Sequence, residues 1–154
     1  MELSSILAPG AVKVFASASS KKRLFQNLAE LAETAYGMEA QPTVDALLDR
    51  ESLGPTGVGH GVALPHARLN TLDRVVGAFI VLEKPLEFGA VDRQPVDIAF
   101  GLFAPEKAGV EHLKALALVS RTLRESSVLT KLRANPDSAT LYTILTENQS
   151  VQAA

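Results

Sequence analysis

Hydrophobic residues at helical spacing dominate the first third of the chain. Within residues 21–36 the apolar positions recur every three or four residues, as on one face of an α-helix. These positions are Leu24, Leu28, Leu31 and Ala35. Ser20 can cap the first turn with its side-chain oxygen, and Gly37 can adopt the left-handed conformation that ends many helices. The pattern therefore predicts a helix over residues 21–36.

Shorter patterns lie on either side of this helix. Residues 11–15 have the character of a short extended segment. Pro42 and Thr43 suit the first turn of a second helix, and the helical pattern after them reaches Leu53 before a Gly-Pro pair breaks it. We therefore expect a strand over residues 11–15 and a helix that begins near Pro42 and ends near Leu53.

The second half of the chain contains two continuous apolar runs, residues 75–82 and 96–103. Runs of this length without alternation are typical of strands that are buried on both faces of a sheet. From about Glu106 helical patterns return, over residues 110–123, 128–133 and 138–145. The alternation predicts one α/β domain over residues 1–154, with a sheet of roughly four to six strands flanked by helices on both faces.

The composition is that of a soluble globular protein, and it excludes several function classes. The 154 residues include no cysteine, which excludes disulfides, thiolate metal sites and a cysteine nucleophile. The net charge is −2 and aromatic residues are only 5%, so nucleic-acid binding is not expected. The chain has neither a signal-peptide pattern nor an apolar run of about 20 residues. We therefore expect a cytoplasmic protein without membrane insertion.

A glycine-dense segment, residues 56–66, precedes the apolar runs. Gly57, Gly59 and Gly61 alternate along it, but Val62 stands where the dinucleotide-binding fingerprint needs a small residue, and the Lys of a P-loop is missing. Two interpretations remain open. The segment is either a glycine-bearing strand packed closely against another element, or a stretch whose backbone N–H groups approach a functional group.

His66 ends this segment and is the first candidate for chemistry. It follows Pro65, which cannot donate a ladder hydrogen bond and tends to end a central strand, so we expect the imidazole at the mouth of a strand. The three histidines, His60, His66 and His112, form no metal-binding spacing, so no metal site is expected. No Gly-x-Ser-x-Gly motif of a serine hydrolase is present either.

Histidine chemistry narrows the remaining choices. A neutral imidazole is a nucleophile at physiological pH, and one ring nitrogen can attack while the other, hydrogen-bonded, fixes the tautomer. A phosphoryl group on His66 would add close to two negative charges and would need nearby cations. Arg50 and Arg68 lie on either side of the glycine segment and are candidates for that role.

Three ordered blocks of sequence add a further signal. The first runs from Arg50-Glu51-x-Leu53 through Thr56-Gly57-x-Gly59 to Gly61-Val62-Ala63-Leu64-Pro65-His66. The second is Phe88-x-Ala90-x-Asp92-x-Gln94-Pro95-Val96-Asp97, and the third is His112-Leu113-x-x-Leu116-x-Leu118. Together they resemble the signature of phosphotransferase system (PTS) IIA domains of the fructose/mannitol/nitrogen type. The similarity extends over residues 3–147.

The resemblance implies a function and a set of site residues. His66 would be the phosphorylated nucleophile, and His112 and Arg50 would line its pocket and stabilise the phosphoryl group. A mixed, mostly parallel sheet flanked by helices is implied, with no cofactor and no metal. The donor would be a histidine phosphocarrier protein. His60 falls at an open position of the signature and receives no role, and Arg68 is expected at the rim of the partner contact.

Two subtypes and one other class remain possible on these residues. Ser20-Lys21-Lys22-Arg23 and a chain that ends without a IIB or IIC domain resemble the stand-alone nitrogen-regulatory type, whose partners would be regulated protein targets. A sugar-specific IIA component of the fructose or mannitol type shares the motifs and would pass the phosphoryl group to a IIB domain. A non-catalytic α/β module for ligand sensing or scaffolding would keep the fold without phosphoryl chemistry.

Overall fold

Five α-helices and one mixed sheet make up the computed structural model, which describes the backbone of residues 1–153 and the side chains of residues 1–147. The helices are α1 (Lys21–Tyr36), α2 (Ala40–Ser52), α3 (Gly109–Thr122), α4 (Ser126–Ala134) and α5 (Ser138–Ala153), with a short 3-10 helix, η1 (Leu3–Ser5). The strands are β1 (Leu7–Phe15), β2 (Gly57–Gly59), β3 (Val62–Ala63), β4 (His66–Leu69), β5 (Val76–Leu86) and β6 (Val96–Pro105).

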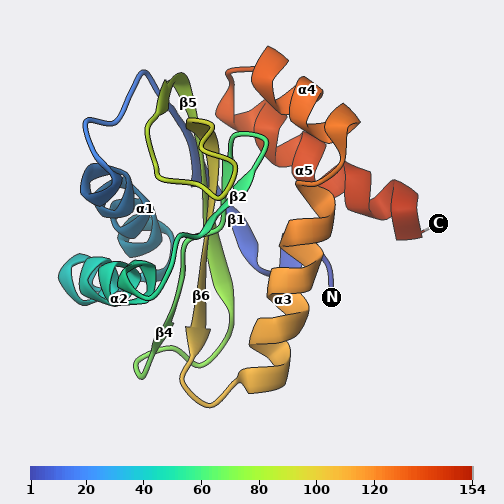
Figure 1. Cartoon of the computed structure of the whole chain (residues 1–154). Coiled ribbons are helices and arrows are strands. Elements are labelled where there is room, and N and C mark those ends of the chain that lie inside the picture. The colour runs from blue at the N-terminus through green and yellow to red at the C-terminus, as the bar shows by residue number, and fades with distance from the viewer. Residues whose placement is uncertain (154) are drawn as a thin grey trace.

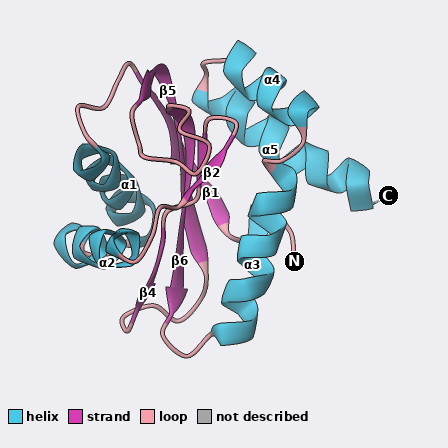
Figure 2. Ribbon diagram, in the orientation of Figure 1, coloured by secondary structure: helices cyan, strands magenta, loops and turns pink. Residues whose placement is uncertain are grey.

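The sheet separates two layers of helices. Its order is β1-β5-β6-β3-β2, and β4 also pairs with β6. The pairs β1–β5, β3–β6 and β4–β6 are parallel, whereas β5–β6 and β2–β3 are antiparallel. Helices α1 and α2 cover one face and α3, α4 and α5 lie on the other (Figures 1 and 2). The prediction of a mixed, mostly parallel sheet with helices on both faces is therefore confirmed.

The first predicted helix is confirmed with both of its ends. Helix α1 spans Lys21–Tyr36, and the backbone N–H of Arg23 donates to the Ser20 hydroxyl at 3.0 Å. Gly37 follows in the left-handed conformation, with φ of 73°, and its N–H donates to the Glu33 carbonyl. Local capping chemistry alone decides both ends, which is why the sequence pattern finds them.

Three other boundaries differ from the pattern, and proline accounts for part of the difference at two of them. Strand β1 begins at Leu7, four residues before the predicted start, and its register shifts between Leu7 and Val12, where a Pro-Gly pair interrupts the apolar pattern. Helix α2 begins at Ala40, two residues before Pro42, which therefore lies inside the first turn, where a missing N–H is tolerated. Helix α5 continues well past the predicted end near residue 145.

The core follows the two apolar runs, as predicted. Strands β5 and β6 are buried along most of their length, and their largest side chains are shielded from solvent on both faces of the sheet. The fully buried members include Phe79, Ile80, Ile98, Phe100 and Phe103. This rigid centre supports β4, whose residues pair with the C-terminal half of β6.

Candidate active site

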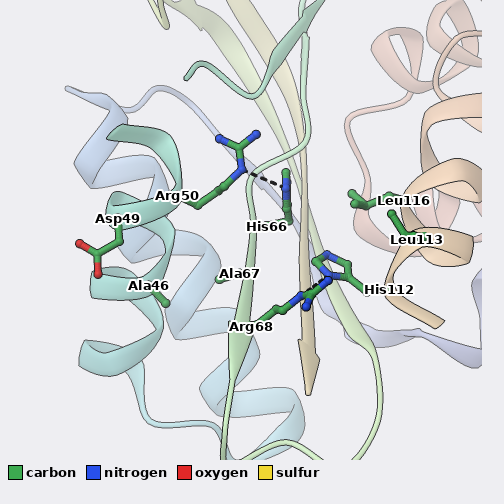
Figure 3. A pocket seen from close by; sticks show the side chains of 9 residues that line it. All are labelled: Ala46, Asp49, Arg50, His66, Ala67, Arg68, His112, Leu113 and Leu116. Atoms are coloured by element: carbon green, nitrogen blue, oxygen red, sulfur yellow. Dashed lines mark hydrogen bonds between the residues drawn. The ribbon is translucent and has the colours of Figure 1, made fainter. Parts of the chain in front are cut away.

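A cleft of about 480 Å³ opens where β4 passes between the two helix layers. Four basic side chains line it: Arg50 from α2, His66 and Arg68 from β4, and His112 from α3 (Figure 3). Ala46, Ala67, Leu113 and Leu116 contribute apolar surface. The structure thus brings together the three predicted site residues, which lie far apart in the sequence.

A strand interruption places His66 in this cleft. Strands β3 and β4 both run parallel to β6, and Leu64 and Pro65 separate them. The prediction that Pro65 ends a strand and leaves His66 at its mouth is wrong in detail, because His66 is itself the first residue of β4 and pairs with Leu102. Pro65 keeps its carbonyl in the sheet by accepting from the Leu102 N–H at 2.9 Å, so the missing donor interrupts the strand without ending it.

Two hydrogen bonds determine which nitrogen of His66 carries the proton. The Leu64 carbonyl lies 2.9 Å from Nδ1, and a carbonyl can only accept, so Nδ1 carries the hydrogen. The Nε–H of Arg50 donates to Nε2 at 3.2 Å, so Nε2 carries the lone pair. Figure 3 shows this Arg50 contact as a dashed line. The neutral ring therefore presents Nε2 as its nucleophilic atom.

The surroundings of His66 favour the neutral ring. Burial lowers the pKa of His66 below its ordinary value, and the charges of Arg50 and Arg68 lower it further. The Leu64 hydrogen bond and the Glu51 carboxylate oppose this shift without reversing it. At neutral pH the imidazole is therefore available as a nucleophile.

His112 is held by the other arginine. The Nε–H of Arg68 donates to His112 Nδ1 at 3.1 Å, and the rings of His112 and His66 meet edge to face with centroids 5.6 Å apart. Burial lowers the pKa of His112 to about 4, with further contributions from His66 and Arg68. His112 is therefore neutral at physiological pH and lies beside the nucleophilic ring.

Arg68 lies in the cleft, as expected of a candidate cation, and it remains solvent-exposed, as expected of a residue at the rim. Its contact with His112 was not predicted. Side chains two residues apart on a strand share a face, so the His66-Ala67-Arg68 spacing was a signal that could have placed Arg68 beside His66. The distant partner, His112, could not be found from local spacing.

A chain of hydrogen bonds holds the carbonyl that orients His66. Glu51, whose side chain is 7% exposed, forms an ion pair with Lys21 at 2.9 Å. It also accepts from both the backbone N–H and the hydroxyl of Thr56. The Thr56 carbonyl in turn accepts from the Leu64 N–H at 2.9 Å. These contacts therefore hold the backbone of Leu64, whose carbonyl accepts from His66 Nδ1.

The glycines of the segment serve packing and do not line the cleft. Its residues form the β2–β3 hairpin, with His60 and Gly61 at φ of 57° and 79° in the turn. A Cβ on Gly57 would lie 2.6 Å from the Ala90 Cβ, so only glycine fits against that neighbour. No glycine lines the cleft. Of the two interpretations left open, the closely packed glycine-bearing strand is supported for these glycines.

Other classes of site find no support in the described residues. In the part of the chain with described side chains, no three His, Cys, Asp or Glu residues gather as metal ligands would. Among the helices described, none is both long and apolar enough to span a membrane.

Comparisons with known proteins agree with this geometry. A family model described as phosphoenolpyruvate-dependent sugar phosphotransferase system, EIIA 2, matches residues 5–148. The nitrogen regulatory protein of Bradyrhizobium diazoefficiens is 42% identical over 145 residues, which cover 94% of this chain and 95% of the relative. That of Klebsiella oxytoca is 39% identical, covering 96% and 91%. The crystal structure of nitrogen regulatory protein IIA-Ntr from Neisseria meningitidis matches with a TM-score of 0.84 and 34% identity, covering 92% of this chain and 97% of that one.

Proposed function

The chain belongs to the EIIA 2 family of the phosphoenolpyruvate-dependent sugar phosphotransferase system, and we propose that it carries a phosphoryl group on Nε2 of His66. The group would come from a histidine phosphocarrier protein. One observation carries the proposal: a neutral imidazole, with Nε2 as its nucleophilic nitrogen, lines a cleft that also holds two arginines. His112 and Arg50 are the residues proposed to stabilise the group.

The phosphoryl transfer requires no proton to move on or off His66. The Nε2 lone pair attacks phosphorus while the nitrogen–phosphorus bond of the donor breaks, and that electron pair returns to the donor imidazole. His66 keeps its Nδ1 hydrogen throughout, and the Leu64 carbonyl, 2.9 Å away, stabilises the positive charge that develops on the ring. The Nδ1–H tautomer, which the resting protein already holds, therefore has its lone pair on Nε2, the attacking atom.

Arg50 would change partners during this step. Its Nε–H occupies the same Nε2 lone pair that must attack, while one Nη donates to the Gly54 carbonyl at 3.0 Å. When phosphorus approaches Nε2, the guanidinium can turn its donors toward the equatorial oxygens, where negative charge is spread during transfer. Arg50 would therefore mask the nucleophile at rest and stabilise the phosphoryl group during the reaction.

The surface around the cleft suits a transient partner. Leu113 lines the cleft and is 65% exposed, and Val110, three positions earlier on α3, is 66% exposed. Exposed apolar side chains next to charged ones are typical of small, short-lived interfaces, which a carrier that receives and then passes on a group requires.

We further propose the nitrogen-regulatory role, because the relatives described above carry that name. The targets would then be regulated proteins. A sugar-specific role, with a IIB domain as acceptor, uses the same site and is the second candidate. The two differ only in what receives the phosphoryl group.

Intact-protein mass measurement tests the phosphoryl carrier directly. The protein is incubated with phosphoenolpyruvate, enzyme I and a histidine phosphocarrier, and we expect it to gain the mass of one phosphoryl group. His66→Ala should gain none, whereas His60→Ala, with its histidine in the β2–β3 turn, should be labelled like the wild type. Labelling of His66→Ala, mapped to His112 or His60, would show that the nucleophile is misassigned.

The same reaction separates the alternatives. Addition of fructose- or mannitol-type IIB domains should leave the label on this protein if it is nitrogen-regulatory, and should remove it if the protein is sugar-specific. A wild-type protein that gains no mass while the phosphocarrier is fully phosphorylated would favour a non-catalytic module.

A further inference from the structure

His112 carries a buried donor without a partner. Its Nε2 is the one buried side-chain nitrogen or oxygen, among the side chains described, that has no hydrogen-bond partner. The residue as a whole is 5% exposed. An unsatisfied buried polar group costs about 1–3 kcal/mol, so an atom left in this state calls for an explanation.

The contact with Arg68 explains which form of His112 is present. The Nε–H of an arginine is always a donor, so the His112 Nδ1 that it contacts at 3.1 Å must be an acceptor. In a neutral ring the hydrogen then resides on Nε2, and burial together with the nearby charges keeps the ring neutral. Without Arg68, nothing in the described contacts would oppose a turned ring or the other tautomer.

We propose that Arg68 is a positioning residue that holds His112 in the Nε2–H tautomer, so that this unpartnered hydrogen is reserved for an oxygen of the phosphoryl group on His66. This inference rests on the proposed phosphoryl chemistry. The edge-to-face contact of the two rings, with centroids 5.6 Å apart, places His112 within reach of a group attached to His66. Arg68 thus acts through His112, while Arg50 acts on the phosphoryl group itself.

The two arginines impose opposite tautomers on adjacent rings. Arg50 leaves the hydrogen of His66 on Nδ1, and Arg68 leaves the hydrogen of His112 on Nε2. One ring therefore supplies a lone pair and the other a hydrogen-bond donor. Both properties are required around the same transferred group: the nucleophile needs a free pair, and the oxygens need donors.

Nitrogen chemical shifts of the histidine rings test the first half of the proposal without any transfer reaction. In uniformly ¹⁵N-labelled protein at neutral pH, we expect His112 to show a protonated Nε2 and a bare Nδ1. Arg68→Met keeps most of the aliphatic stem and removes the donor, so the His112 shifts should move toward averaged values. His66 should keep its Nδ1–H pattern and serves as the internal control. Unchanged His112 shifts in Arg68→Met would overturn the proposal.

Single-turnover transfer from a purified phosphorylated carrier tests the second half. Arg68→Met should slow the step about tenfold at saturating carrier, the lower end of the cost of removing a partner behind a functional histidine in metal sites. Arg68→Lys retains a donor and should recover part of the rate. Arg121→Met removes the same charge from an exposed position of α3 outside the cleft and should transfer normally.

A double-mutant cycle distinguishes positioning from direct contact. If Arg68 acts through His112, then adding Arg68→Met to His112→Gln should cause no further loss. A full additional tenfold loss would mean that Arg68 binds the phosphoryl group or the carrier directly, and the positioning role would be wrong. If the wild type accepts no phosphoryl group at all, the proposed function fails, while the ¹⁵N shifts still decide whether Arg68 sets the tautomer.

Discussion

At the scale of the residue, single hydrogen bonds decide which nitrogen of each histidine ring in the cleft carries the hydrogen. Arg50 and Arg68 each direct one Nε–H at a histidine, but at different ring nitrogens, so His66 and His112 differ in what they offer. A lysine in either position would supply charge without the fixed planar set of donors that an arginine presents. The arrangement therefore depends on donor geometry as much as on positive charge.

Arg50→Lys should slow phosphoryl acceptance at least about tenfold. Arg50 bridges His66 Nε2 and the Gly54 carbonyl, and one ammonium cannot reproduce both contacts and then supply parallel donors to the phosphoryl oxygens. Complete loss of one positioned donor lowers the rate by about 10²–10³, and the loss should be smaller here because lysine still supplies a charged donor. Rapid-quench measurement at saturating phosphorylated carrier provides the rate. Arg121→Lys is the control, and equal rates for both variants would assign Arg50 a structural role.

His112 should make stability depend on pH. Its pKa is about 4 in the folded protein, whereas an unfolded histidine titrates near 6.5. Between these values the unfolded chain binds a proton that the folded protein does not, so this contribution is present above pH 6.5 and is lost as pH falls toward 4. The shift corresponds to on the order of 3 kcal/mol.

His112→Gln should remove that dependence. Urea unfolding of wild type and variant at several pH values between 7 and about 4 gives two stability curves, and their difference isolates His112 from the carboxylates that titrate in both. We expect the wild type to lose more stability than the variant on acidification. Parallel curves would mean that His112 titrates normally in the folded protein.

Local rules explain which elements could be predicted from the sequence. Helix α1 was predicted to the residue because Ser20 and Gly37 determine its ends by contacts with their own neighbours. The buried strands were predicted from uninterrupted apolar runs. The interruption at Pro65 was predicted, but the return of the chain to the sheet as β4 was not. That return depends on the pairing of His66 with Leu102, which lies 36 residues later in the sequence.

The site was predictable to a different extent. The resemblance supplied Arg50, His66 and His112, but periodicity and composition could not place residues from α2, β4 and α3 around one cleft. Which ring nitrogen is nucleophilic could not be predicted, because it depends on distances from the Leu64 carbonyl and from Arg50. Such contacts arise only when the helix layers are docked on the sheet.

Ser20→Ala should destabilise the protein by about 1 kcal/mol, the usual cost of losing an N-cap. The Ser20 hydroxyl accepts from the Arg23 N–H, which has no partner within the helix, and alanine would leave that donor to solvent. Thermal or urea unfolding measures the change. Ser17→Ala, exposed in the loop before α1, should stay within a few tenths of wild type. Equal effects of the two substitutions would contradict the capping role.

At the scale of the whole molecule, the sheet supports a surface that another protein must find. The cleft lies along β4 and is lined by the exposed Leu113 of α3, and Val110 is exposed one turn earlier on the same helix. The proposed exchange of a phosphoryl group requires an encounter strong enough to align two imidazoles and weak enough to separate within a turnover. A few exposed apolar side chains around a basic cleft meet both conditions.

Leu113→Glu should weaken the encounter with the phosphocarrier and leave the step after binding nearly unchanged. Replacing a 65% exposed leucine should cost little stability. The new carboxylate would, however, lose its water when the partner covers this surface, which weakens binding. We expect the carrier concentration at half-maximal rate to rise several-fold, while the rate at saturation stays within about twofold of wild type. Val91→Glu, also exposed but outside the cleft, is the control. A selective fall in the saturated rate would place Leu113 in the chemistry instead.

The cleft takes one wall from each helix layer, Arg50 from α2 and His112 from α3, with β4 between them (Figures 1 and 3). Undocking either layer would separate these walls, even while the hydrogen bonds between β5 and β6 persisted. Phosphoryl acceptance is therefore a more demanding measure of integrity than strand content. On gradual denaturation it should vanish before the central amide protons begin to exchange, and a preparation that retains its full β-sheet spectrum can already have lost its site.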